Sequence, residues 1–196
     1  STFLNTACGH KVSIVTPTPQ TTRSRIRGIV TRDSGQIVFL DTPGFHASNR
    51  KFNQRMMGVV SESLGDADAV LLVLDGSRRS GDEEQAILEE VERTRKPWAL
   101  AVNKEDLDPG AAALRVEEIR RRLDSRQEKT GSSLSLPPLL TLNARDTDSA
   151  EKVVRLLIPL LPEGEPYYPE EYYTDQDPTF RVTEIVREKA MALARE

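Results

Sequence analysis

Short apolar runs alternate with amphipathic segments along most of the chain. The apolar runs predict buried strands at residues 36–40, 69–74, 98–102 and 139–142. Helical spacing and helix-start or helix-stop residues predict helices at residues 1–9, 52–64, 111–127 and 150–161, and one that opens at Gly81. Because strands that alternate with helices form parallel sheets with right-handed crossovers, the pattern predicts an α/β fold.

One pair of strands departs from this alternation. Residues 27–31 and 36–40 are separated only by Arg32, Asp33, Ser34 and Gly35, which predicts an antiparallel hairpin. Just before it, Arg23, Arg25 and Arg27 alternate and so share one face of an extended segment. A solvated face is favoured over RNA contact for these arginines.

The second hairpin strand runs directly into Asp41-Thr42-Pro43-Gly44, followed by Phe45. A carboxylate fixed at a strand end can hold a Mg²⁺-bound water. Gly44 can bring its backbone N–H against a phosphate because it has no Cβ. The four residues therefore favour a magnesium and γ-phosphate sensor, although taken alone they suit an ordinary turn equally well.

A second apolar run, residues 99–102, ends in Asn103-Lys104-Glu105-Asp106. The Asp106 carboxylate can accept from both N1–H and the exocyclic amine of guanine, a pattern that adenine lacks. Asn103 is expected to brace the neighbouring loops, and the stem of Lys104 to cover one face of the base. The alternative is a turn that caps a helix opening near Asp108 and Pro109.

These two motifs lie about sixty residues apart, each at the carboxyl end of an apolar strand. Ligands of open α/β sheets bind at that edge, so a shared edge favours a nucleotide site over two unrelated turns. Leu142, Asn143, Ala144 and Arg145 follow the last predicted strand. Their backbone N–H groups are expected to reach the base oxygen at the same edge.

Composition narrows the class of protein. With 196 residues and 37% hydrophobic content, the chain is long enough for one α/β domain with a small appendage. The run at residues 69–74 is too short to span a membrane, and no signal-peptide pattern opens the chain. A single Cys8 with His10 and His46 gives no disulfide and no zinc set. The net charge of −4 argues against an electrostatic nucleic-acid binder.

The first residues resemble the helix that follows a phosphate-binding loop. In the pattern G-x-x-x-x-G-K-[ST] the last residue opens a helix, and Ser1-Thr2 stands in that place, although any surface helix can begin with such a cap. The loop at residues 17–23 then offers exposed hydroxyls as a second Mg²⁺ ligand. A plain Ser/Thr/Pro loop is the alternative.

The last residues change character. Residues 162–178 contain prolines and the pairs Tyr167-Tyr168 and Tyr172-Tyr173 among acids, which predicts a linker. Packing of these rings on the first domain is favoured over stacking on nucleobases, because the surrounding charge is negative. Residues 180–196 form an amphipathic helix, and a lone helix beyond a linker has no core of its own. We expect it to begin a second domain.

These residues resemble the Era GTPases, bacterial Ras-like proteins with a C-terminal KH RNA-binding domain. The similar segments span essentially the whole chain: Ser-Thr-Phe-Leu-Asn at the start, Gln20-Thr21-Thr22-Arg23, Asp41-Thr42-Pro43-Gly44, Asn103-Lys104-Glu105-Asp106, Pro169-Glu170-Glu171-Tyr172, and Thr183 to Lys189. The resemblance implies a Ras-like P-loop GTPase domain, with a mostly parallel sheet and helices on both faces, over residues 1–161. It also implies a linker at residues 162–178 and the first helix of a KH domain at residues 179–196.

The resemblance implies a GTP-hydrolysing switch in small ribosomal subunit maturation. Its expected cofactors are GTP or GDP and Mg²⁺, and its expected partner is 16S rRNA, bound through the missing KH domain. We expect a cytoplasmic monomer, with peripheral membrane association left open. The predicted Mg²⁺ ligands are Ser1, Thr22 (favoured over Thr21) and Asp41; the catalytic residues are Thr22, Asp41 and Gly44. The predicted nucleotide-binding residues are Ser1, Thr2, Asp41, Thr42, Pro43, Gly44, Phe45, Asn103, Lys104, Glu105, Asp106, Leu142, Asn143 and Ala144.

Four points separate this chain from the family pattern or from other GTPases. The Walker A glycines and lysine and the KH GxxG loop are absent, and Asn143 stands where the family has serine. Phe45 is apolar where many GTPases have a glutamine that orients water, so slow hydrolysis is expected. Without the first strand, inner strand edges are left unpaired, at about 1–3 kcal/mol per buried group. We therefore expect a fragment of a longer protein, whose GTPase activity as it stands is not assured.

Two alternatives to this hypothesis remain. The first is a nucleotide-independent scaffold for RNA or ribosome assembly that keeps only the fold. The second is a related GTPase with another partner, such as one of tRNA modification, against which the C-terminal segment argues.

Overall fold

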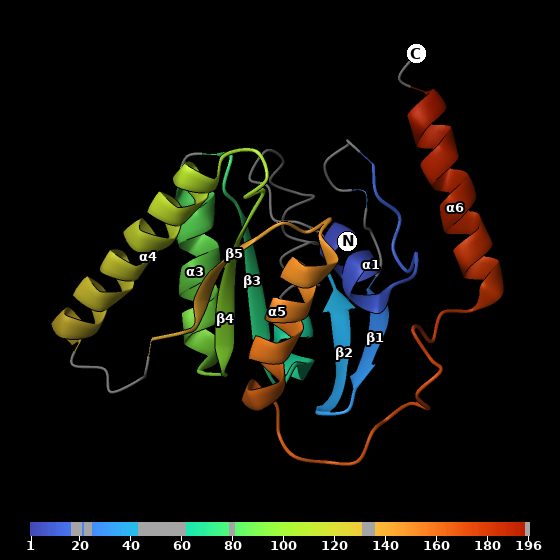
Figure 1. Ribbon diagram of the computed structural model, residues 1–196, viewed down its shortest axis with the longest axis horizontal. Helices are drawn as coiled ribbons and strands as arrows, with labels where there is room; N and C mark the ends of the chain where they lie inside the picture. The colour runs from blue at the N-terminus through green and yellow to red at the C-terminus, as the bar shows by residue number, and fades with distance from the viewer. Residues whose placement is uncertain (17–20, 22–24, 43–61, 79–80, 131–135, 195–196) are drawn as a thin grey trace. The chain divides into compact units, whose positions relative to one another are not determined.

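The computed structural model describes residues 1–16, 21, 25–42, 62–78, 81–130 and 136–194, drawn in colour in Figure 1. The chain divides into two compact units, one of residues 1–67 with 163–196 and one of residues 68–162. Most of the helix expected at residues 52–64 lies outside the described residues, and residues 62–66 are helical. Within the described part of the chain, no helix is both long and apolar enough to span a membrane.

The first unit is built on a helix and a hairpin. Helix α1 (Thr2–Cys8) has Ser1 at its N-cap and ends at Gly9, whose φ of 66° is left-handed and favours glycine. Strands β1 (Ile26–Arg32) and β2 (Gly35–Asp41) pair antiparallel. Their register runs from Ile26 opposite Asp41 to Arg32 opposite Gly35, so the predicted hairpin is confirmed.

A small apolar core holds α1 on the hairpin. Leu4, Val12 and Ile26 are buried together, with Cys8, Phe39 and Tyr173 packed against them. A Cβ added at Gly28 would lie 2.4 Å from Leu4 Cδ1 and 3.0 Å from Cys8 Sγ, so the strand and the helix approach closely at this glycine. The close approach fixes α1 directly beside β1.

The linker runs along β1. The N–H of Ile29 donates to the carbonyl of Tyr173 at 2.9 Å, and the hydroxyl of Thr174 donates to the carbonyl of Arg27 at 2.8 Å. Tyr173 also stacks on His10 with ring centroids 4.0 Å apart. The prediction that linker aromatics pack on the first domain is confirmed for Tyr173, whereas Tyr167 is 86% exposed.

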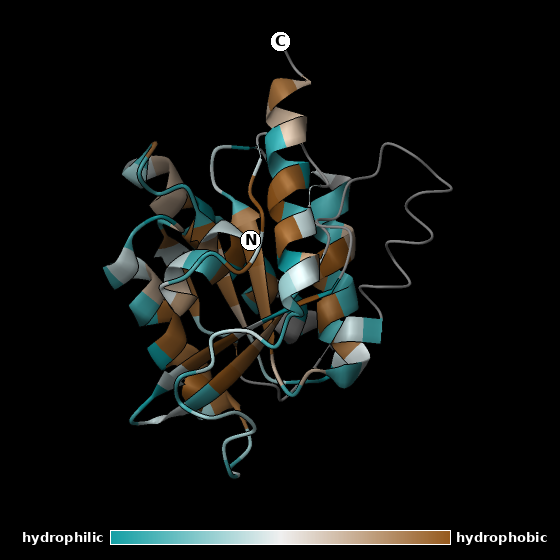
Figure 2. Cartoon of the chain, turned by 90° about the vertical axis from the view of Figure 1, so that its right-hand side faces the viewer, coloured by the Kyte–Doolittle hydropathy of each residue, from teal (hydrophilic) through white to brown (hydrophobic). Residues whose placement is uncertain are grey.

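Helix α6 (Pro178–Leu193) follows the linker and begins two residues before its predicted start. Asp177 caps it by accepting from the N–H groups of Thr179 and Phe180. Glu188 on α6 is buried, pairs with Lys11 and accepts the N–H of Val15 at 3.2 Å. Figure 2 shows apolar bands along this helix, where Val182, Val186 and Leu193 are exposed.

The second unit contains a three-stranded parallel sheet in the order β3-β4-β5. The strands are β3 (Val70–Asp75), β4 (Trp98–Asn103) and β5 (Leu139–Leu142), close to the predicted ranges. Residues 99–102 in the central strand are fully buried. The register places Asp75 beside Asn103 and Asn103 beside Leu142, so the three strands end together at their carboxyl edge.

The helices of this unit connect and cover its strands (Figure 1). They are α3 (Asp82–Thr94), α4 (Pro109–Thr130), α5 (Thr147–Leu157) and the short 3-10 helix η1 (Ile158–Leu160). Apolar residues of α3 and α4 pack with the strand residues Leu72, Leu74, Leu100 and Val102 in one core. Asp146 caps α5 by accepting the N–H of Ser149 at 2.7 Å.

Candidate functional site

Asn103, the last residue of β4, ties together the loops that follow all three strands. Its side-chain Oδ1 accepts the N–H of Ala144 at 3.0 Å, beyond the end of β5. Its backbone carbonyl accepts the N–H of Gly76 at 2.9 Å, beyond the end of β3. This geometry is the brace expected of Asn103, and it sets the spacing of the loops at the carboxyl edge.

Gly76 has no room for a side chain. A Cβ at this position would lie 2.8 Å from the carbonyl oxygen of Asn103 and 2.8 Å from Cγ1 of Val102. Because the first of these atoms belongs to the backbone, it cannot rotate away. Glycine at this position therefore permits the brace made by Asn103.

Lys104 adopts a left-handed backbone with φ of 71°, a conformation that costs energy in any residue other than glycine. Its Nζ lies 2.8 Å from Oδ2 of Asp75 at the end of β3. Burial raises the pKa of Asp75, but hydrogen bonds from Lys104 and Ser77 outweigh it and hold that pKa below its ordinary value. The ion pair fixes the lysine stem across the strand edge, where a base-covering role remains a prediction.

Glu105 and Asp106 continue the turn after β4. The N–H of Glu105 donates to the carbonyl of Leu142 at 3.2 Å, which links this turn to the end of β5. The carboxylate of Asp106 is exposed and has no hydrogen-bond or ion-pair partner among the described residues. An unpartnered carboxylate is suited to accept two N–H groups from a ligand.

The loop after β5 is held by its own side chains. The N–H of Asn143 donates to the hydroxyl of Ser149 at 2.9 Å, and Oδ1 of Asn143 accepts the N–H of Arg145 at 3.0 Å. Leu142 is fully buried. Since the N–H of Ala144 is bonded to Asn103, an incoming base oxygen would compete with that amide for the donor.

In the first unit, oxygen atoms gather around Asp41 at the end of β2. The hydroxyl of Ser1 donates to Oδ2 of Asp41 at 2.7 Å, and the hydroxyl of Ser13 donates to the same atom at 3.0 Å. Carboxylate and hydroxyl oxygens are the hard donors that Mg²⁺ prefers, so the predicted pair Ser1 and Asp41 fits this ion.

Several predicted site residues are not placed. Thr22, Pro43, Gly44 and Phe45 lie outside the described residues. Thr21 is buried, and its hydroxyl lies 2.6 Å from that of Thr16; the preference for Thr22 as the Mg²⁺ ligand stays a prediction. Thr2 and Thr42 are described, but neither makes a side-chain hydrogen bond to Ser1, Ser13 or Asp41 among the described residues. No group of three or more potential metal-ligating His, Cys, Asp or Glu side chains occurs within the described ranges.

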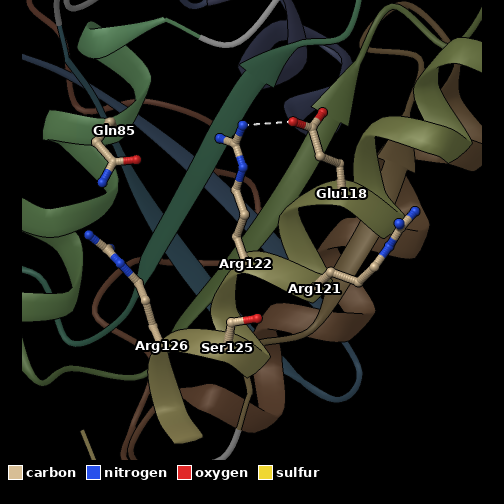
Figure 3. A pocket seen from close by; sticks show the side chains of 6 residues that line it. All are labelled: Gln85, Glu118, Arg121, Arg122, Ser125 and Arg126. Atoms are coloured by element: carbon tan, nitrogen blue, oxygen red, sulfur yellow. Dashed lines mark hydrogen bonds and ion pairs between the residues drawn. The ribbon is translucent and has the colours of Figure 1, made fainter. Parts of the chain in front are cut away.

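A pocket of about 470 Å³ lies elsewhere in the second unit, between α3 and α4 (Figure 3). None of its lining residues belongs to the predicted nucleotide site: Gln85, Glu118, Arg121, Arg122, Ser125 and Arg126. Arg122 pairs with Glu118 at 2.7 Å, and Arg126 pairs with Glu89 at 2.7 Å. The positive charge of the pocket is largely neutralised by these ion pairs, and Arg120, Arg121 and Arg122 are exposed to solvent.

Sequence reasoning missed Ser13. Its side chain is 1% exposed, and it comes from the segment between α1 and β1. In the sequence it is one polar residue between Val12 and Ile14, and nothing local indicates that it meets Asp41, which is 28 positions away.

Comparison with known proteins adds independent information. A family model described as 50S ribosome-binding GTPase matches residues 1–104. The GTPase Era of Treponema denticola is 44% identical over 197 residues, covering 100% of this chain and 64% of the relative. The GTPase Era of Borrelia garinii subsp. bavariensis is 39% identical over 196 residues, with the same two shares.

Solved structures match along the whole chain as well. One is Era in complex with MgGDPNP and nucleotides 1506–1542 of 16S ribosomal RNA, with a TM-score of 0.81 and 32% identity over 100% of this chain. Another is a variant of Aquifex aeolicus Era bound to GDP and AlF4⁻, with a TM-score of 0.80 and 32% identity. The chain spans 64% of the length of each of these structures.

Proposed function

The chain belongs to the Era family of GTPases, and on this premise we propose that it forms the nucleotide-binding part of a GTP-hydrolysing switch that acts in small ribosomal subunit assembly. Its fold class is the α/β fold of P-loop GTPases, as predicted. Because the chain spans 64% of its relatives, the activity and partners of the whole protein form part of the proposal. The proposal assigns residues 1–161 to the G domain, residues 162–178 to the linker and residues 179–196 to the beginning of a KH domain.

The strand edge of the second unit carries the proposal. There an exposed, unpartnered Asp106 carboxylate follows an Asn103 that fixes the loops after β3 and β5. Guanine presents two adjacent N–H donors to a carboxylate, whereas adenine has an acceptor at N1. Recognition by Asp106 would therefore select guanine strongly, since an adenine would leave the carboxylate facing a lone pair.

The Asp41 cluster supplies the second function that a GTPase needs. We assign Ser1, Asp41 and Thr22 as the residues that hold Mg²⁺, with Gly44 donating its N–H to the γ-phosphate. When bound, Mg²⁺ neutralises charge on the β- and γ-phosphates. The short contact between Ser1 Oγ and Asp41 Oδ2, 2.7 Å, supports this assignment because it brings the two oxygen donors together before any ion is present.

The proposed partner is the 16S rRNA of the small subunit. The description of the matching family model names the 50S ribosome, but the match ends at residue 104 and does not include the linker or α6. The Era structure solved with 16S rRNA matches the whole chain, including these segments. We therefore favour the small subunit, and we place the protein in the cytoplasm, where that subunit is assembled.

A displacement titration tests the nucleotide part of the proposal. The full-length gene product is loaded with a fluorescent GDP analogue in Mg²⁺, and unlabelled GDP, ADP and XDP compete for the site. GDP is expected to displace the probe and ADP is not. In Asp106→Asn, GDP affinity is expected to fall by on the order of a hundredfold, while XDP, with an acceptor in place of the amine, gains affinity.

Two results would overturn the proposal. If the folded protein never binds the probe, the scaffold alternative replaces the switch. If ADP competes as well as GDP, Asp106 does not recognise guanine. For the RNA partner, co-sedimentation of the full-length protein with 30S particles is expected, and association with 50S particles alone would refute the small-subunit assignment.

A further inference from the structure

The Asp41 carboxylate is held by a residue that the nucleotide-binding motifs do not contain. Oδ2 of Asp41 accepts hydrogen bonds from Ser1 at 2.7 Å and from Ser13 at 3.0 Å. Ser1 is itself a predicted Mg²⁺ ligand, so its hydroxyl would have to turn toward the ion. The hydroxyl of Ser13 is not a predicted Mg²⁺ ligand, so it can keep its bond to Asp41 both with and without bound Mg²⁺.

Ser13 is buried to an extent unusual for a polar side chain. It is 1% exposed and lies between the buried residues Val12 and Ile14. A hydroxyl removed from water costs free energy unless it is hydrogen-bonded, so its bond to Asp41 compensates for burial. The same bond orients the carboxylate, since a carboxyl group with a fixed donor on one oxygen is restricted about χ2.

Asn5 fixes the backbone of Ser13. Its Oδ1 accepts the N–H groups of Val12 and Ser13, both at 2.8 Å, and its Nδ2 donates to the carbonyl of Ser13 at 2.7 Å. The oxygen and the nitrogen of the Asn5 amide are thus both hydrogen-bonded to the backbone of Val12 and Ser13. The three bonds leave the Ser13 backbone little freedom to rotate away from Asp41.

Asn5 and Ser1 lie one turn apart on the same helix. The N–H of Asn5 donates to the carbonyl of Ser1 at 3.0 Å, as in the first turn of α1. Helix α1 therefore acts on Asp41 twice, directly through the Ser1 hydroxyl and indirectly through Asn5 and Ser13. All four residues belong to the first compact unit.

We propose that Ser13 is a positioning residue for Mg²⁺ binding, held by Asn5, and that it orients the Asp41 carboxylate toward the ion and its water. This inference rests on the proposed function, because it presupposes that Asp41 holds Mg²⁺ through a bound water. Partners that orient a metal-binding carboxylate typically change metal affinity by about 10- to 100-fold when removed. Loss of the Ser13 hydroxyl should weaken Mg²⁺ binding more than it weakens nucleotide binding.

The test separates Mg²⁺ affinity from nucleotide affinity and from folding. Full-length wild type, Ser13→Ala and Ser13→Thr are loaded with a fluorescent GDP analogue, and Mg²⁺ is titrated while nucleotide release is followed. Nucleotide affinity in EDTA and the thermal unfolding midpoint of the nucleotide-free protein are measured beside it. Thr6→Ala serves as a control on α1, because the Thr6 hydroxyl donates to the carbonyl of Thr2 within the same helix and is not one of the donors to Asp41 seen in the described residues.

We expect S13A to raise the Mg²⁺ concentration at half-saturation about tenfold, while the affinity for the GDP analogue in EDTA stays within about twofold of the wild-type value. S13T, which keeps the hydroxyl, restores the wild-type value, and T6A does not change it. Asn5→Ala gives a similar shift, and the double variant N5A/S13A shifts no further than S13A, because Asn5 acts through Ser13. If S13A does not fold, Ser13→Cys, with its weak donor, takes its place with the same expectation.

The inference is overturned if S13A has the wild-type Mg²⁺ dependence. It is also overturned if affinities with and without Mg²⁺ fall by the same factor together with the unfolding midpoint, because that result describes a residue needed only for folding. If wild type binds no guanine nucleotide, the proposed function fails and the inference falls with it. If wild type binds in an Mg²⁺-dependent way and S13A is unaffected, only the role of Ser13 is refuted.

Discussion

Arg115 on α4 donates through Nη2 to both carboxylate oxygens of Glu84 on α3, at 2.5 and 2.6 Å. The side chains are only 8% and 13% exposed, so this is a largely buried ion pair between two helices that share one core. Glu118 accepts a third bond from the same guanidinium, through Nη1, at 2.9 Å. The pair aligns α3 with α4 in a way that apolar contacts alone do not.

Arg115→Ala is expected to destabilise the protein by about 3–5 kcal/mol, because it leaves the Glu84 carboxylate buried without its partner. Urea unfolding followed by circular dichroism measures the change. Arg120→Ala is the matched control, since Arg120 is exposed and its contact with Glu117 is a loose 3.8 Å, worth about 0–1 kcal/mol. Equal midpoints for the two variants would contradict the assignment.

Gly76→Ala is expected to reduce guanine-nucleotide affinity about tenfold, an effect of roughly 1.4 kcal/mol. The added Cβ would meet the carbonyl oxygen of Asn103 at 2.8 Å and push the loop away from the β4 end. Competition with unlabelled GDP on the full-length protein measures the loss. Gly164→Ala is the control, because a Cβ there meets nothing within 4 Å; a G76A protein that binds GDP like this control contradicts the prediction.

Phe45→Gln is expected to keep or raise GTP turnover, since a phenyl ring cannot orient the attacking water and a glutamine amide can. Phosphate release from the full-length protein under saturating GTP is the measurement. Asp41→Asn, which weakens Mg²⁺ binding, is the comparison and should lose most turnover. A Phe45→Gln protein that folds and binds GTP but does not turn it over contradicts the view that Phe45 is catalytically passive.

Stability should depend on pH through Glu188 on α6. Burial raises the pKa of Glu188, but bonds from Lys11 and the N–H of Val15 outweigh it and hold that pKa below its ordinary 4.5. The stability that Glu188 adds is therefore fully present above pH 4.5 and is lost as pH falls through the lower folded pKa. Its contribution should vanish in strong acid.

Glu188→Gln tests this dependence. Unfolding free energies of the variant and wild type should differ near neutral pH and converge as the pH drops below the folded pKa of Glu188. Glu163→Gln, at an exposed position in the linker, is the control and should track wild type throughout. A constant difference at every pH would show that Glu188 acts by packing and not by charge.

Cys8 should be slow to react with thiol reagents. Burial raises the pKa of its thiol to about 11, more than nearby Arg32 lowers it. At pH 8 only about a thousandth of the thiol is then ionised, against roughly a quarter for an ordinary cysteine. Alkylation by iodoacetamide, read by mass spectrometry, should be slow in the native protein and rapid in urea; equal rates would contradict burial of the thiol.

The strands and their edges could be predicted from the sequence because the signals are local. Apolar runs of four to six residues ending in polar residues placed β3, β4 and β5 close to their observed bounds, and short turn chemistry placed the hairpin. Asn103 and Asp106 were predicted as guanine-site residues for the same reason. The prediction depends only on their residue types and on their place directly after an apolar strand. The observed brace by Asn103 agrees with that expectation.

The contacts of Ser13, Asn5 and the linker could not be predicted. Ser13 reaches Asp41 28 positions away, and the Gln36 amide bonds to both the N–H and the carbonyl of Tyr168, 132 positions away. The bonds of Asn5 span only seven and eight positions, but they depend on the fold of the loop that follows Gly9. Pro-rich composition predicts an extended linker but not the strand along which it runs. Similarly, a serine between two apolar residues carries no signal of its partner until tertiary packing brings Asp41 to it.

The course of the linker along β1 has a consequence for self-association. A strand at the edge of a sheet has unpaired N–H and carbonyl groups that can pair with a strand of another chain, and such edges promote aggregation. Here the carbonyl of Tyr173 accepts the N–H of Ile29, and the hydroxyl of Thr174 donates to the carbonyl of Arg27. The linker therefore shields that stretch of β1 from another copy, and removal of the residues that follow Tyr168 would expose it to strand-to-strand association.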